Sequence, residues 1–92
     1  MKNLSKNKKY TNFNITFNTV SPGPIFIKDT YWDKVKKKNK KQLKNWVEKN
    51  IPVNRLGAVE DVSNLVAFLA SNNASFINGA NFIIDGGKSN SI

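Results

Sequence analysis

Two glycine-containing turns, each directly after an apolar segment, are the parts of this chain best suited to contact a ligand. The first is Ser21-Pro22-Gly23-Pro24-Ile25, and the second is Ile84-Asp85-Gly86-Gly87. Gly23 lets another group come close to the backbone, and Pro22 and Pro24 make the turn rigid. The same residues would also serve as a plain strand-ending turn. The binding interpretation therefore depends on the elements that surround the two turns.

The composition excludes several kinds of active site. The 92 residues contain no Cys, so disulfides, thiolate nucleophiles and zinc–sulfur sites are ruled out. They contain no His, which removes the imidazole base of a Ser-His-Asp arrangement. We assign no catalytic residue and no metal site from the sequence.

The formal net charge of +9 is concentrated in the first half of the chain, where Lys is abundant between Lys28 and Lys49. Such a basic segment is typical of proteins that contact nucleic acid, an anionic membrane surface or an acidic partner. It is also typical of a solvated helix face, and the abundance of Lys and Asn throughout the chain favours that interpretation. We expect no specific nucleic acid and no membrane as partner.

The hydrophobic pattern predicts a strand, two helices and a second strand. Residues 14–20 alternate apolar and polar side chains, and 80–84 form a short apolar strand that suits cover on both faces. We expect the two prolines after the first strand to stop its pairing. Residues 29–49 read as one helix with Trp32, Val35, Leu43 and Trp46 on a single stripe, and residues 59–71 as another.

This order predicts an α/β fold in which the two strands are parallel, because long helical crossovers join parallel strands. The chain divides into a frayed basic lead-in (1–13), a folded part (14–87) and a tail (88–92). Two strands alone make a poor sheet, so the pattern calls for further strands. No segment is apolar for long enough to cross a membrane, and we expect a cytoplasmic protein.

Several segments, in this order and spacing, resemble the C-terminal segment of the short-chain dehydrogenase/reductase family. They are residues 18–25 (NTVSPGPI), 51–62 (IPVNRLGAVEDV), 65–71 (LVAFLAS), 74–79 (ASFING) and 82–87 (FIIDGG). The resemblance implies that residues 14–87 are the C-terminal part of a Rossmann-type, doubly wound fold. Such folds bind a dinucleotide at the carboxyl ends of their strands.

The resemblance assigns roles to particular residues. It makes Pro22, Gly23, Pro24 and Ile25 a vestigial nicotinamide loop for NAD or NADP. Many members carry Thr two residues after the Ile of this loop, where this chain has Ile27. It places Tyr31 and Trp32 in a lid over the substrate, although packing of the helix is the favoured role for Trp32 and Trp46. It also makes the last helix and strand a subunit interface, through Phe68, Phe82, Ile83 and Ile84.

The chain lacks the groups that carry the family's chemistry. No Gly-rich turn that could cradle a pyrophosphate occurs, and neither Tyr10 nor Tyr31 is followed four residues later by Lys. The resemblance therefore implies a truncated oxidoreductase, inactive alone and with no NAD(P) affinity as an isolated chain. Its partner would be a second copy or the missing N-terminal part. The alternative is a basic module that contacts an anionic partner through Lys28–Lys49.

Overall fold

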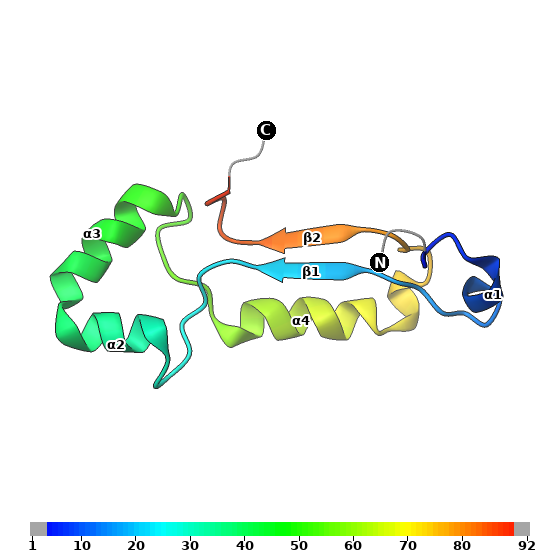
Figure 1. The fold of residues 1–92 in the computed structure, drawn as a ribbon, viewed down its shortest axis with the longest axis horizontal. Helices are drawn as coiled ribbons and strands as arrows, with labels where there is room; N and C mark the ends of the chain where they lie inside the picture. Colours follow the sequence, from blue (N-terminus) through cyan, green and yellow to red (C-terminus); the bar gives the residue numbers. More distant parts are fainter. Residues whose placement is uncertain (1–3, 90–92) are drawn as a thin grey trace. The chain divides into compact units, whose positions relative to one another are not determined.

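The predicted α/β fold is confirmed by the computed structural model, which describes residues 4–89 (Figure 1). The ends of the predicted lead-in and tail, residues 1–3 and 90–92, lie outside the described residues. The elements in chain order are α1 (Lys8–Thr11), β1 (Thr19–Pro22), α2 (Tyr31–Lys38), α3 (Lys40–Asn50), α4 (Val59–Leu69), a 3-10 turn η1 (Asn72–Ala74) and β2 (Asn81–Ile84).

The two strands pair with each other in parallel, as predicted (Figure 1). The N–H of Thr19 donates to the carbonyl of Ala80 at 2.9 Å, and the N–H of Gly23 donates to that of Ile84 at 2.8 Å. The expectation that the prolines stop this pairing is wrong, because it continues to Gly23. Alternate residues of a strand point their N–H groups to opposite edges. Pro22 therefore falls on the edge away from β2, where its missing donor costs no bond in the ladder.

The first strand begins five residues later than predicted, because side-chain amides interrupt the main-chain ladder ahead of it. There the N–H of Gly79 still donates to the carbonyl of Phe17, at 2.8 Å. The side chain of Asn78 accepts the N–H of Phe17 at 3.1 Å, and the side chain of Asn18 accepts the N–H of Ala80 at 3.0 Å. These bonds hold the two segments together without regular strand geometry. The alternation within 14–20 carries no information about such bonds.

The single helix predicted over residues 29–49 is two helices, which break at Asn39. This residue has an extended backbone, with φ −157° and ψ 95°. Its N–H donates to the carbonyl of Val35 and ends α2, while its side-chain oxygen accepts the N–H of Gln42 at 3.0 Å and caps α3. Asn competes in this way with helix continuation and is a preferred N-cap.

The predicted second helix and second strand are confirmed as α4 and β2, each with bounds within two residues of the prediction. The sequence of β2 suits cover on both faces, and the described residues cover one of them. Phe82 and Ile84 are half-buried, whereas Ile83 keeps 51% of its surface exposed. One face of the strand is therefore open in the described structure.

The chain forms two compact units. The first contains the residues up to Ser21 together with Ser63–Ile83, and Ala74 is its buried apolar residue. The second contains Pro22–Val62 and the residues from Ile84, and its core is Leu43, Val47 and Ile51, with Trp32, Val35, Trp46 and Leu56 packed against them. None of the helices described is both long and apolar enough to cross a membrane.

Candidate functional site

The predicted nicotinamide loop is held by a short parallel bridge between Ile25 and Gly57. The N–H of Phe26 donates to the carbonyl of Gly57 at 2.8 Å, and the N–H of Gly57 donates to the carbonyl of Pro24 at 3.0 Å. The two bonds flank Ile25, so the loop continues the direction of β1 and does not simply end the strand.

This bridge leaves the backbone of Ile25 free on its other side. In extended chain, consecutive peptide groups point to opposite edges. Because Pro24 and Phe26 use the edge that faces Gly57, the N–H and carbonyl of Ile25 point to the opposite edge. Neither group has a hydrogen-bond partner among residues 4–89. One donor and one acceptor therefore stand side by side for an external group that offers both.

The side chain of Ile25 packs over Gly57. A Cβ atom built on Gly57 would lie 2.5 Å from the Cδ1 atom of Ile25. The isoleucine therefore lies directly over the glycine, and this contact helps to fix the loop that presents the free backbone groups.

Gly23 is required by a neighbour within the same unit, Asp85. A Cβ atom on Gly23 would lie 2.5 Å from the Cβ atom and 2.9 Å from the Cα atom of Asp85. Asp85 is itself fixed, because its carboxylate accepts the N–H groups of Gly87 at 2.9 Å and Ser89 at 2.8 Å. Hydrogen bonds from Ser89 lower the pKa of Asp85 below its usual value. The two turns singled out in the sequence therefore meet at this point.

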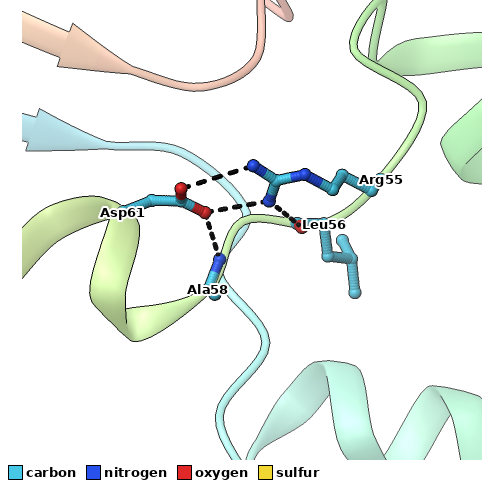
Figure 2. Close-up of polar contacts among 4 residues, drawn as sticks. All are labelled: Arg55, Leu56, Ala58 and Asp61. Atoms are coloured by element: carbon cyan, nitrogen blue, oxygen red, sulfur yellow. Dashed lines mark hydrogen bonds and ion pairs between the residues drawn. The ribbon is translucent and has the colours of Figure 1, made fainter.

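A fork of hydrogen bonds between Arg55 and Asp61 fixes the segment that carries Gly57 (Figure 2). The two guanidinium nitrogens lie 2.9 and 3.3 Å from the two carboxylate oxygens, and Asp61 also accepts the N–H of Ala58 at 2.7 Å. The bonds from Arg55, followed by that from Ala58, lower the pKa of Asp61 to about 2. Because the carboxylate satisfies its guanidinium, Arg55 acts as a positioning residue.

The two predicted lid residues lie at the start of α2 in different environments. Tyr31 is 67% exposed, whereas Trp32 is half-buried and lies 4.6 Å from Trp46, centroid to centroid. Packing against Trp46 accounts for Trp32 without a substrate. Tyr31 touches Trp32 edge-on, with the ring centroids 4.9 Å apart, and presents most of its surface to solvent.

A buried carboxylate anchors the beginning of α2. Asp33 is 5% exposed, accepts the N–H of Asp29 at 2.8 Å and lies 3.2 Å from the ammonium of Lys37. The bond from Asp29 is the first cause of the lowered pKa of Asp33. Asp29 has φ 65°, so the anchor also holds a left-handed turn at the entry to α2.

The predicted interface residues keep different amounts of surface exposed. Phe68 on α4 is 45% exposed and Ile83 is 51% exposed, while Phe82 and Ile84 are half-buried. Sequence reasoning missed Phe76, which is fully exposed after η1. Among the residues that the structure describes, no group of acidic side chains could hold a metal ion.

The hydrogen-bond partners of Asp61 and Asp85 were not predicted from the sequence. Both stand within the quoted motifs, at the first turn of a helix and at the end of a strand. A carboxylate next to glycine after a strand commonly accepts backbone N–H groups of the following turn. That signal was available for Asp85, whereas the partner of Asp61 depends on how the loop folds back.

Comparison with known proteins shows the family. A profile of the family described as enoyl-(acyl carrier protein) reductase matches residues 5–89. The match covers nearly all of the chain, and this chain belongs to the short-chain dehydrogenase/reductase family.

Similar proteins are longer than this chain. The 3-oxoacyl-(acyl-carrier-protein) reductase of Rickettsia prowazekii is 49% identical over 73 residues, which is 79% of this chain and 28% of that protein. The crystal structure of YwfH, an NADPH-dependent reductase involved in bacilysin biosynthesis, gives a TM-score of 0.79 at 38% identity, over 99% of this chain and 35% of that one. A 4-hydroxyisoleucine dehydrogenase complexed with NADH gives 0.73 at 31% identity, over 91% and 33%. The chain spans about 28% of the length of the curated relatives it matches.

Proposed function

We propose that this chain forms the nicotinamide-facing part of an NAD(P)-dependent oxidoreductase that interconverts a carbonyl and an alcohol. A bound nicotinamide cofactor would supply or accept the hydride. The observation that best supports this proposal is the free N–H and carbonyl of Ile25, which lie on one edge of a loop that is paired with Gly57. A carboxamide offers a donor and an acceptor, and it therefore matches this pair. Gly23 makes no direct contact with the cofactor in this proposal, because Asp85 occupies the space over it.

We further propose that the chain is inactive alone. Its sequence has no Tyr-x-x-x-Lys pair to handle the proton and no Gly-rich turn to hold a pyrophosphate. The loop would then bind only a small part of the dinucleotide, and two backbone hydrogen bonds contribute about 1–3 kcal/mol between them. That is too little for measurable NAD(P) affinity against the cost of association.

We propose that the missing groups are supplied by another chain, through the last helix and strand. Phe68 and Ile83 offer exposed apolar area in the first unit, and half-buried Phe82 and Ile84 would lose further surface on contact. Exposed aromatic and aliphatic side chains of this kind are typical of subunit contacts. The partner that supplies these groups is a chain that carries the earlier strands. A second copy of this chain lacks the same groups and would add only a subunit contact. Tyr31, as the exposed member of the lid pair, would be the residue to face a substrate.

Complementation tests this proposal. The chain is co-expressed with the part of the Rickettsia reductase that precedes the matched segment, and carbonyl reduction is followed with NADH and NADPH. We expect activity from the pair and none from either piece. Activity of this chain alone, or failure of the pair although the two pieces co-purify, would contradict the proposal.

Two substitutions at one position isolate the free N–H group. Ile25→Pro and Ile25→Ala both remove the side chain over Gly57, but only the proline removes the donor. We expect the complemented pair to keep activity with alanine and to lose about tenfold with proline, since one hydrogen bond of about 1.4 kcal/mol corresponds to that factor. Equal activities of the two variants would show that the N–H group makes no contact.

A further inference from the structure

We infer that a separate groove in the second unit binds a single-chain alkyl carboxylate, with its chain in the groove and its head on the lysines at the rim. The groove is shallow and open to solvent, with a volume of about 360 Å³. Its floor is apolar and its rim is entirely cationic, with Phe26, Leu43, Val47 and Leu56 below and Lys36, Lys40, Lys44 and Arg55 around them. It contains no residue of the Pro22–Ile25 loop and neither Tyr31 nor Trp32, so the inference does not rest on the proposed function.

The groove is built mainly by one helix. Leu43 and Val47 are four residues apart on α3, and Lys40 and Lys44 are likewise four apart. Residues at this spacing form rows along one side of a helix. An apolar row and a basic row therefore run next to each other, and this arrangement suits a linear molecule that is apolar along its length and anionic at one end.

The rim lysines are available for a ligand. In the described part of the chain, Lys36, Lys40 and Lys44 form no ion pair, whereas Lys37, one residue along α2, contacts both Asp29 and Asp33. Arg55 is already paired with Asp61. The ammonium groups of Lys40 and Lys44 have no partner among residues 4–89, whereas that of Lys36 lies over the ring of Phe26. No acidic side chain is among the residues that line the groove. The positive charge around the groove therefore favours an anionic ligand over a neutral or cationic one.

The shape of the groove separates this ligand from larger anionic partners. Leu43 and Val47 are only 7% and 8% exposed, so they lie below the lysines and cannot insert into a membrane. Phe26 is the only aromatic residue of the floor, and the ammonium of Lys36 lies 5.3 Å from its ring centroid. That cation occupies the place where a base would stack. The volume lies at the small end of the range for ligand pockets, which suits one alkyl chain.

Chain length provides the first test. Octanoate, decanoate and dodecanoate are titrated against the full chain below their micelle concentrations, with binding followed by calorimetry. We expect Kd to fall about two- to fourfold for each added methylene, as for apolar groups that leave water. Affinity independent of chain length would overturn the inference, because it would mean that only the charges bind.

Charge position provides the second test. The double variant Lys40→Glu/Lys44→Glu is compared with Lys34→Glu/Lys49→Glu, which changes the net charge equally at exposed positions outside the groove. We expect dodecanoate to bind roughly five- to tenfold more weakly to the first variant and unchanged to the second. Equal losses in both variants would overturn the inference. So would binding only to anionic vesicles and not to dissolved dodecanoate.

Discussion

Replacing Ile51 by alanine should unfold much of the second unit, because this side chain packs between α3 and the turn that follows β2. Ile51 is 3% exposed and lies against Gly86, where an added Cβ would meet its Cγ2 atom at 2.8 Å. The substitution removes three carbon atoms from this place. At about 0.8 kcal/mol for each buried carbon, with a further cost for the cavity, we expect a loss of about 2.5–4 kcal/mol. Ile51→Val removes one carbon and should cost about 1 kcal/mol.

The assay is urea unfolding followed by tryptophan fluorescence. Both tryptophans, Trp32 and Trp46, lie in the second unit, so the signal reports on that unit. A fixed concentration of trimethylamine N-oxide in all samples raises the stability of each variant enough to define a baseline. Val53→Ala, at a side chain that is 57% exposed, is the matched control and should change stability by less than about 0.5 kcal/mol. An Ile51→Ala variant as stable as this control would refute the assigned core.

Three further substitutions test the polar contacts. The pKa of Asp61 is about 2 against a usual value of 3.8, so its pair with Arg55 stabilises the fold above about pH 4, and this contribution should be lost as the pH falls through 2. Asp61→Asn should therefore show a flatter fall of the urea midpoint between pH 4 and 2, and a slope equal to that of the parent would contradict this. Asn18→Ala removes two side-chain hydrogen bonds and should lower the free energy of unfolding by about 1–3 kcal/mol. The amide of Ala80 should then exchange faster, and an unchanged exchange rate would show that the Asn18 side chain does not hold this segment. Asn39→Ala removes the N-cap of α3 and should lower the free energy of unfolding by about 1 kcal/mol. If neither the helical circular dichroism signal nor the melting temperature changes, the cap does not stabilise the fold.

The elements that the sequence predicts well are those whose period is carried by several side chains in a row. The apolar residues of Val59–Leu69 repeat at helical spacing over three turns, and the helix follows. β2 is short but ends at Asp85-Gly86-Gly87, whose positive φ values at both glycines stop a strand. In both cases, local preference and tertiary packing favour the same structure.

The errors occur where one side chain changes the course of the backbone. Asn39 divides the predicted long helix because its amide caps α3, although the apolar stripe continues across it. Asn18 delays the first strand because its amide bonds to a segment about sixty residues away. The hydrophobic pattern cannot predict such hydrogen bonds, because it treats every polar residue in the same way.

The sequence predicted which residues form the candidate site, but it did not predict how they are arranged in space. The Pro-Gly loop was recognisable from its sequence, and the importance of Ile25 came from resemblance. Its free backbone pair follows from the bridge to Gly57, which lies 32 residues later in the chain. No local pattern indicates which loop lies over which glycine. For the same reason, the sequence did not predict that Asp85 packs over Gly23.

The placement of Pro22 affects how this protein would self-associate. The edge of β1 away from β2 is a possible template for strands of other molecules, as in cross-β aggregates. Every second residue presents its N–H group there, and at Pro22 that group is absent. A short strand with such a gap offers few donors for growth. Aggregation of the isolated polypeptide should therefore proceed through its exposed apolar side chains. It should give an amorphous precipitate in preference to ordered fibrils.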